Sequence, residues 1–181
     1  MNMDRLVIKQ ILGNEQVTQY YVVSLIGKTL VLLIAPINTI VISYLTKRKE
    51  RLTRSQFGKA VLAGGGASLV FFVACQIGTP LFVWLFYRNL YESVKGIVTV
   101  VNLAQILGLF SAFLFILVLT FTDERWQLWI QLAHFCILLV SSVLAARTYG
   151  MMGFAVASLG ANSLRVAAVV ILGIVKAGKD K

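Results

Sequence analysis

Two cationic residues stand inside long apolar runs, where a charge is costly. Lys28 lies about eight residues into a run that begins near Tyr20, and Arg165 lies near the middle of the last run. A charge inside a membrane must find water, an anion or an opposite charge. Arginine donates two parallel hydrogen bonds to an oxyanion, whereas lysine acts as a mobile point charge. We therefore expect both residues to face a cavity that receives an anionic ligand.

Both cations also have structural interpretations. The four-carbon stem of Lys28 could carry its charge to the headgroups from this shallow depth. Arg165 could bridge to a helix carbonyl or to a further lobe of the protein. No acidic residue lies at central depth in the apolar runs. That absence favours water or an anionic ligand over an ion pair within the runs.

Uncharged polar residues share helix faces in two other runs. On helical wheels Asn102 and Gln105 fall together beside Gly108, and Gln131 falls on the same face as His134. Asn102, Gln105 and Gln131 are therefore candidates for substrate binding alongside the two cations. Hydrogen bonding between helices is the alternative, and it accounts for most such residues in membrane proteins.

Two titratable residues are candidates for proton coupling. His134 lies in the fourth apolar run, and Asp4 lies ahead of the first one. Histidine changes its charge near neutral pH, which suits a proton relay. A structural histidine with satisfied hydrogen bonds is the alternative, because one titratable group without a carboxylate in the same run is a weak relay.

The residue patterns of enzymes are absent from the sequence. It contains no nucleophile–base pair, no paired carboxylates and no glycine-rich phosphate loop. Cys75 and Cys136 lie in apolar runs without the spacing of a metal site or a disulfide framework. We therefore expect a protein that is not an enzyme and that uses no metal and no cofactor.

Long apolar helices must position these polar residues. Of the 181 residues 59% are apolar, and the mean hydropathy is +0.84, whereas soluble domains are roughly 45–50% apolar. Apolar runs long enough to span a hydrocarbon core of roughly 30 Å cover residues 20–45, 60–86, 96–121, 126–146 and 150–175. The sequence therefore predicts an all-α fold, a polytopic transmembrane bundle of about five complete helices. Pro36 and Pro80 should bend the first and second helices.

Positive charge is concentrated on one side of this bundle. Six cations occupy the connection between the first two helices, whereas the next connection has Arg88 and Lys95. Because cytoplasmic loops are enriched in Lys and Arg, we expect this connection and the C-terminus in the cytoplasm, and the chain in the inner (plasma) membrane. The net charge of +10 then meets anionic headgroups, so we expect membrane lipid and no nucleic acid as partner. The six cations are Lys47, Arg48, Lys49, Arg51, Arg54 and Lys59.

The N-terminal segment is too polar to span a membrane by itself. Residues 6–12 are typical of the last turns of a helix, so we expect residues 1–19 to form the end of an upstream helix and an external connection. Residues 20–181 would form the bundle. Residues 1–12 lack the pattern of a signal peptide, and an upstream helix would explain how Asp4 and Arg5 reach the outside.

Several short motifs resemble one transporter superfamily. Residues 4–8 (DRLVI) are followed by residues 11–13 (ILG) and 20–21 (YY), and residues 149–155 (YGMMGFA) open the last helix. With a proline in the first complete helix and a basic loop after it, this order resembles the C-terminal lobe of polysaccharide exporters and lipid-linked oligosaccharide flippases. These proteins belong to the multidrug/oligosaccharidyl-lipid/polysaccharide exporter superfamily.

The resemblance implies transport of polysaccharide or polyprenyl-pyrophosphate-linked oligosaccharide by alternating access, in the synthesis of lipopolysaccharide or capsule. The pyrophosphate would be the anion that Lys28 and Arg165 meet. A missing N-terminal lobe or glycan-assembly proteins would then be partners. Two alternatives remain open. One is half of a cation-coupled drug exporter, in which Asp4 could serve as the coupling carboxylate; the other is a non-transporting membrane subunit of a glycan-assembly complex.

Overall fold

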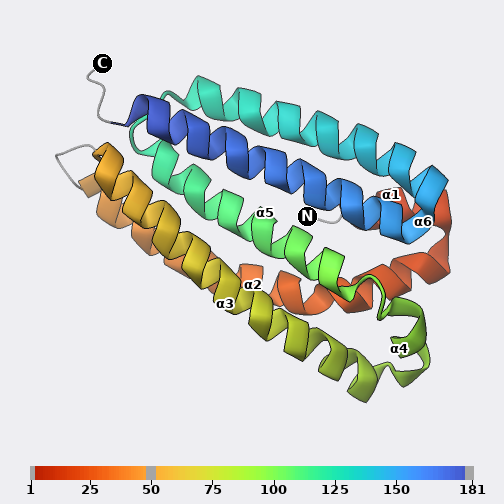
Figure 1. Cartoon of the computed structure of the whole chain (residues 1–181). Helices are drawn as coiled ribbons and strands as arrows, with labels where there is room; N and C mark the ends of the chain where they lie inside the picture. Colours follow the sequence, from red (N-terminus) through yellow and green to blue (C-terminus); the bar gives the residue numbers. More distant parts are fainter. Residues whose placement is uncertain (1–2, 48–51, 178–181) are drawn as a thin grey trace.

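The protein is a bundle of helices. A computed structural model describes residues 3–47 and 52–177, and these residues contain no strand. The predicted all-α fold is therefore confirmed. Arg48, Lys49 and Arg51 of the basic connection lie outside the described residues. The helices are α1 (Met3–Leu12), α2 (Asn14–Lys47), α3 (Arg54–Phe86), α4 (Arg88–Val94), α5 (Val98–Leu119) and α6 (Glu124–Lys176) (Figure 1).

Helix α6 is a hairpin of two antiparallel arms. A straight helix of 53 residues would be about 80 Å long, far more than a membrane is thick. Gly150 has φ +61° and ψ −143°, a conformation that glycine adopts readily and other residues avoid. The chain reverses there, so that a first arm (residues 124–149) and a second arm (residues 151–176) lie side by side (Figure 1). The helices expected at 126–146 and 150–175 are these arms.

Within the described residues, four helices are long and apolar enough to cross a membrane, and α6 contributes two arms to the bundle. They are α2 as far as Leu45, then α3, α5 and α6. Large apolar side chains on their outer faces are exposed, among them Leu32, Leu62 and Leu128. Apolar surface of this extent suits hydrocarbon rather than water. These helices support a transmembrane bundle.

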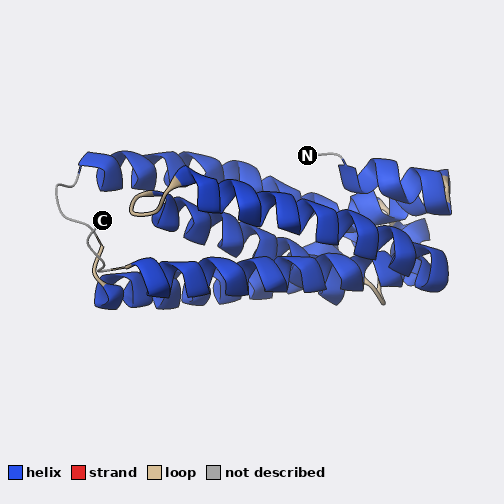
Figure 2. Cartoon of the chain, turned by 90° about the horizontal axis from the view of Figure 1, so that it is seen from above, coloured by secondary structure: helices blue, strands red, loops and turns tan. Residues whose placement is uncertain are grey.

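The bundle has two ends. Figure 1 shows α4, the turn between α1 and α2 and the reversal of α6 together at one end, which we name the Gly150 end. Residues 52–54, the α5–α6 connection and Ala177 lie at the other, which we name the basic end. Figure 2 shows the same long axis from above.

Helix α5 is the central element, because it packs against α2, α3 and α6. Its buried residues join two apolar clusters. Val101 belongs to the cluster near the Gly150 end, with Val23 and Val83, whereas Leu114 belongs to the cluster near the basic end, with Phe57. Phe57 occupies the space that a side chain at Gly173 would fill, since a Cβ there would lie 2.1 Å from its Cζ atom.

The N-terminal region differs in detail from the prediction. Residues 14–19, expected in a connection, are the first turns of α2, and Gly13 with φ +94° is the only residue between α1 and α2. The short helix α4 was not expected. Helix α2 continues through Pro36 as one helix, and it changes direction midway (Figure 1). Glycine between two helices permits the sharp reversal that brings α1 back along α2.

The close approach of the α6 arms gives a first prediction. A Cβ at Gly153 would lie 2.1 Å from the carbonyl oxygen of Ala145, whereas a Cβ at Gly160 meets nothing within 4 Å. Gly153→Ala should therefore lower the free energy of unfolding by about 1–3 kcal/mol through overpacking against backbone. Gly160→Ala should raise it by about 0.5–1 kcal/mol, because alanine favours the helix. Unfolding by SDS in bicelles measures both, and equal effects would contradict the close approach.

Candidate functional site

An ion pair joins the first two helices. The Nζ atom of Lys28 lies 2.5 Å from Oδ2 of Asp4, and the two side chains are 28% and 20% exposed. Helix α1 brings Asp4 to this position by folding back along α2. Lys28 therefore has an internal partner, contrary to the expectation of an unpaired cation. That expectation considered acids only within the five apolar runs, and Asp4 lies ahead of them.

Aromatic rings surround the ion pair. The Arg5 guanidinium lies 4.0 Å from the centroid of the Tyr21 ring, and Lys28 Nζ lies 6.0 Å from that of Tyr20. Tyr20 is buried and packs edge-on against Phe154 of the second arm of α6, with ring centroids 5.2 Å apart. Cation–π contacts of this kind stabilise positive charge away from bulk water. The Arg5–Tyr21 contact joins α1 to α2, and the Tyr20–Phe154 contact joins α2 to the second arm of α6.

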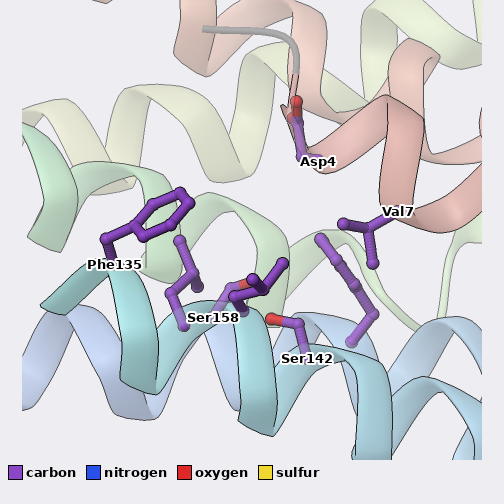
Figure 3. A pocket seen from close by; sticks show the side chains of 8 residues that line it. Asp4, Val7, Phe135, Ser142 and Ser158 are labelled. Carbon is purple, nitrogen blue, oxygen red and sulfur yellow. The ribbon is translucent and has the colours of Figure 1, made fainter.

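A small cavity of about 70 Å³ lies between α1 and the arms of α6. Asp4, Ser142 and Ser158 are among its lining residues, and Figure 3 shows Asp4 across the cavity from the two serines, with its carboxylate turned away from them. The Oγ atom of Ser142 is buried and has no hydrogen-bond partner among the described residues. A cavity with polar atoms and this volume has room for water. Water in this cavity would lie beside Asp4, which is one of its lining residues.

Asn102 and Gln105 bind α5 to its neighbours. Asn102 Nδ2 donates to the carbonyl oxygen of Cys75 at 3.1 Å and to Oε1 of Gln76 at 3.0 Å, both on α3. Gln105 Nε2 donates to the carbonyl oxygen of Ser24 on α2 at 3.2 Å. Both predicted substrate-binding residues therefore hold helices together in this structure, which was the alternative interpretation.

Asn162 connects both arms of α6 to α5. His134 Nε2 lies 3.1 Å from Asn162 Oδ1, to which its N–H donates, and Asn162 Nδ2 donates to the carbonyl oxygen of Ala104 at 2.9 Å. On a helical wheel Asn162 falls on the same face of the last apolar run as Arg165. The sequence alone could not show that this face of the second arm meets the face of the first arm that carries His134.

Arg165 lies next to these hydrogen bonds of Asn162 and has no acidic partner among the residues that the structure describes. Its guanidinium lies 5.5 Å from the centroid of the Phe115 ring on α5, and its buried Nε atom has no hydrogen-bond partner in residues 3–47 and 52–177. It is near enough to His134 for the two to interact electrostatically. An arginine in this state retains unused donors for an anion.

The predicted site residues thus form separate groups. Asp4 and Lys28 are paired at the α1–α2 contact, whereas His134 and Arg165 lie on the two arms of α6, near enough to interact. Gln131 lines a different pocket near the basic end, one turn from His134. Comparisons of the chain with models of protein families, with curated proteins and with solved structures gave no match. Function is therefore inferred from the arrangement of these residues.

Proposed function

We propose that this chain moves a polysaccharide or a polyprenyl-pyrophosphate-linked oligosaccharide across the inner membrane, as a flippase-like bundle that works by alternating access. The proposal rests on the surroundings of the Arg165 side chain. Its guanidinium packs against Phe115 of α5, and its buried Nε atom has no hydrogen-bond partner within the part of the chain that the structure describes. The resemblance to polysaccharide exporters supplies the class of substrate.

The energetics of Arg165 support an anionic ligand. A central arginine costs about 2.5–3.5 kcal/mol on insertion scales, and a cation–π contact with Phe115 offsets only about 0.5–2 kcal/mol. A pyrophosphate would accept bidentate hydrogen bonds from the guanidinium. His134, held by Asn162, would stand beside that group. The ligand would thus supply the interactions that the bundle does not.

The Asp4–Lys28 pair would couple transport to a cation. A proton or cation bound at Asp4 would weaken its hold on Lys28, and the freed ammonium group could then meet the substrate. The cavity beside Asp4 would admit the coupling species.

The same carboxylate favours a second candidate, half of a cation-coupled drug exporter. Uptake of a cationic dye into inverted vesicles, driven by an imposed proton or sodium gradient, would distinguish it from a glycan flippase.

The transport assay uses the purified full chain in liposomes with a fluorescently labelled lipid-linked sugar in both leaflets. A flippase exposes the inner-leaflet label to a membrane-impermeant quencher added outside, so quenching should exceed the half seen at once in empty liposomes. Binding of the lipid without this additional quenching would support the alternative of a non-transporting subunit. Absence of both would contradict the proposal.

We further propose that the basic end faces the cytoplasm. Described cations there include Arg54, Lys59 and Lys176, and cytoplasmic loops are enriched in such residues. In a background with Cys75 and Cys136 replaced by alanine, Ser55→Cys should react with an impermeant thiol reagent only after the cells are opened. Asn89→Cys at the Gly150 end should react in intact cells. The reverse pattern would refute this orientation. Both positions are exposed.

A further inference from the structure

A pocket with a mainly apolar surface and several polar lining residues opens near the basic end, between α5 and the first arm of α6. Its volume is about 460 Å³. Phe115 contributes one wall from α5, and the first two turns of α6 contribute the rest. The lining residues from α6 are Glu124, Arg125, Gln127, Leu128 and Gln131.

Gln127 is the residue that points to a ligand. It is only 6% exposed, yet its Nε2 atom has no hydrogen-bond partner among the described residues. A buried donor without an acceptor is destabilising, and such groups are rare in folded proteins. Gln131 lies one helical turn away on the same face. Two amides therefore line the pocket side by side, and one of them needs an acceptor.

The depth of the pocket is that of lipid headgroups. Trp126 and Trp129 lie in the same two turns of α6 and are exposed. Tryptophan is enriched at the boundary between hydrocarbon and water. Lys176 Nζ lies 5.5 Å from the centroid of the Trp126 ring, which places an aliphatic stem and a charge at this level. A ligand in the pocket would therefore be part of a lipid at the membrane surface.

The charges of the pocket are of both signs. Arg125 and the N-terminal end of α6 favour an anion, whereas Glu124 favours a cation. A fully anionic headgroup would leave the carboxylate unpaired, and a headgroup with phosphate and amine would satisfy both. Phe115 and Leu128 give the pocket an apolar wall on which the glycerol and upper acyl carbons could rest.

We propose that this pocket binds a phospholipid headgroup that carries a phosphodiester and a primary amine. The phosphate oxygens accept hydrogen bonds from Gln127, Gln131 and Arg125, and the ammonium group pairs with Glu124. The bound headgroup joins α5 to the first arm of α6 at the basic end. The pocket shares Phe115 with the surroundings of Arg165, but binding of a phospholipid here does not depend on the transport activity.

The test measures the unfolding temperature of the full chain in detergent micelles, with one lipid added at a time. Phosphatidylethanolamine should raise the Tm by several degrees, because a ligand that binds only the folded state stabilises it. Phosphatidylglycerol lacks the amine, and the quaternary ammonium of phosphatidylcholine cannot donate a hydrogen bond, so both should raise it less. Equal rises with all three lipids would overturn the proposal.

Variants separate the pocket from general effects of lipid. Gln127→Leu and Arg125→Ala should lose most of the response to phosphatidylethanolamine. Gln10→Leu and Arg147→Ala, at exposed positions elsewhere in the chain, should keep it. If Gln127→Leu has a higher Tm than the unmodified protein and its Tm rises equally with phosphatidylethanolamine, the Gln127 amide takes no part in lipid binding. That result would overturn the proposal. If Gln127→Leu does not fold, the test uses Arg125→Ala instead. Native mass spectra should then show less bound phosphatidylethanolamine on Arg125→Ala than on the unmodified protein, and equal amounts would overturn the proposal.

Discussion

Arg165→Ala should abolish flipping of a lipid-linked sugar while leaving the amount of folded protein in the membrane unchanged. The guanidinium is the only described group between α5 and α6 with a full positive charge, a buried unpartnered donor and no acid beside it. Removing it removes the proposed anchor for pyrophosphate. The assay is quenching of labelled lipid in liposomes, with abundance measured on the same membranes.

Arg165→Lys should restore part of the rate. It keeps the charge but loses the planar fork that donates two parallel hydrogen bonds. Lys28→Ala should reduce transport less than Arg165→Ala, and Arg147→Ala, at an exposed position on the same helix, should transport normally. Lower abundance of Arg165→Ala would indicate a structural role instead. Normal transport at normal abundance would refute both interpretations.

Asp4→Asn should lower the free energy of unfolding by about 2–3 kcal/mol. Loss of one partner from a buried ion pair costs about 3–5 kcal/mol, because the other charge stays uncompensated. This pair is partly exposed, so water screens some of that loss. Unfolding by SDS in bicelles, followed by tryptophan fluorescence, measures the change.

The double variant Asp4→Asn/Lys28→Met should recover part of the lost stability, since no charge is then left without a partner. The exposed pair of Glu92 and Lys95, with the same 2.5 Å separation, is a matched control. Glu92→Gln should cause no measurable change, because exposed ion pairs contribute little. If Asp4→Asn behaves like Glu92→Gln, the ion pair does not hold α1 to α2.

The long helices could be predicted because their apolar runs exceed twenty residues and their boundaries carry charge. The arms of α6 were placed within a few residues, although the pattern alone did not show that Gly150 by itself makes the turn. The sequence alone does not show which distant segments are in contact. A helical wheel gives the face of each polar residue but not the face that it meets, so the bond between His134 and Asn162 was missed.

The Asp4–Lys28 pair was missed for a related reason. Residues 1–19 were interpreted as the end of a helix and a connection, and a connection gives Asp4 no fixed position. The single residue between α1 and α2, Gly13, determines where Asp4 lies. Helix α1 is amphipathic, so its sequence indicates an apolar face, but it does not show which helix that face meets.

The turn at Gly150 bears on how the last two crossings enter the lipid during biosynthesis. With no loop between the arms, neither can insert fully while the other stays in water, and the two should partition into the bilayer as one helical hairpin. The insertion penalty of Arg165, about 2.5–3.5 kcal/mol, would then be set against the apolar side chains of both arms. The apolar side chains of the first arm would therefore promote insertion of the second arm, which carries Arg165.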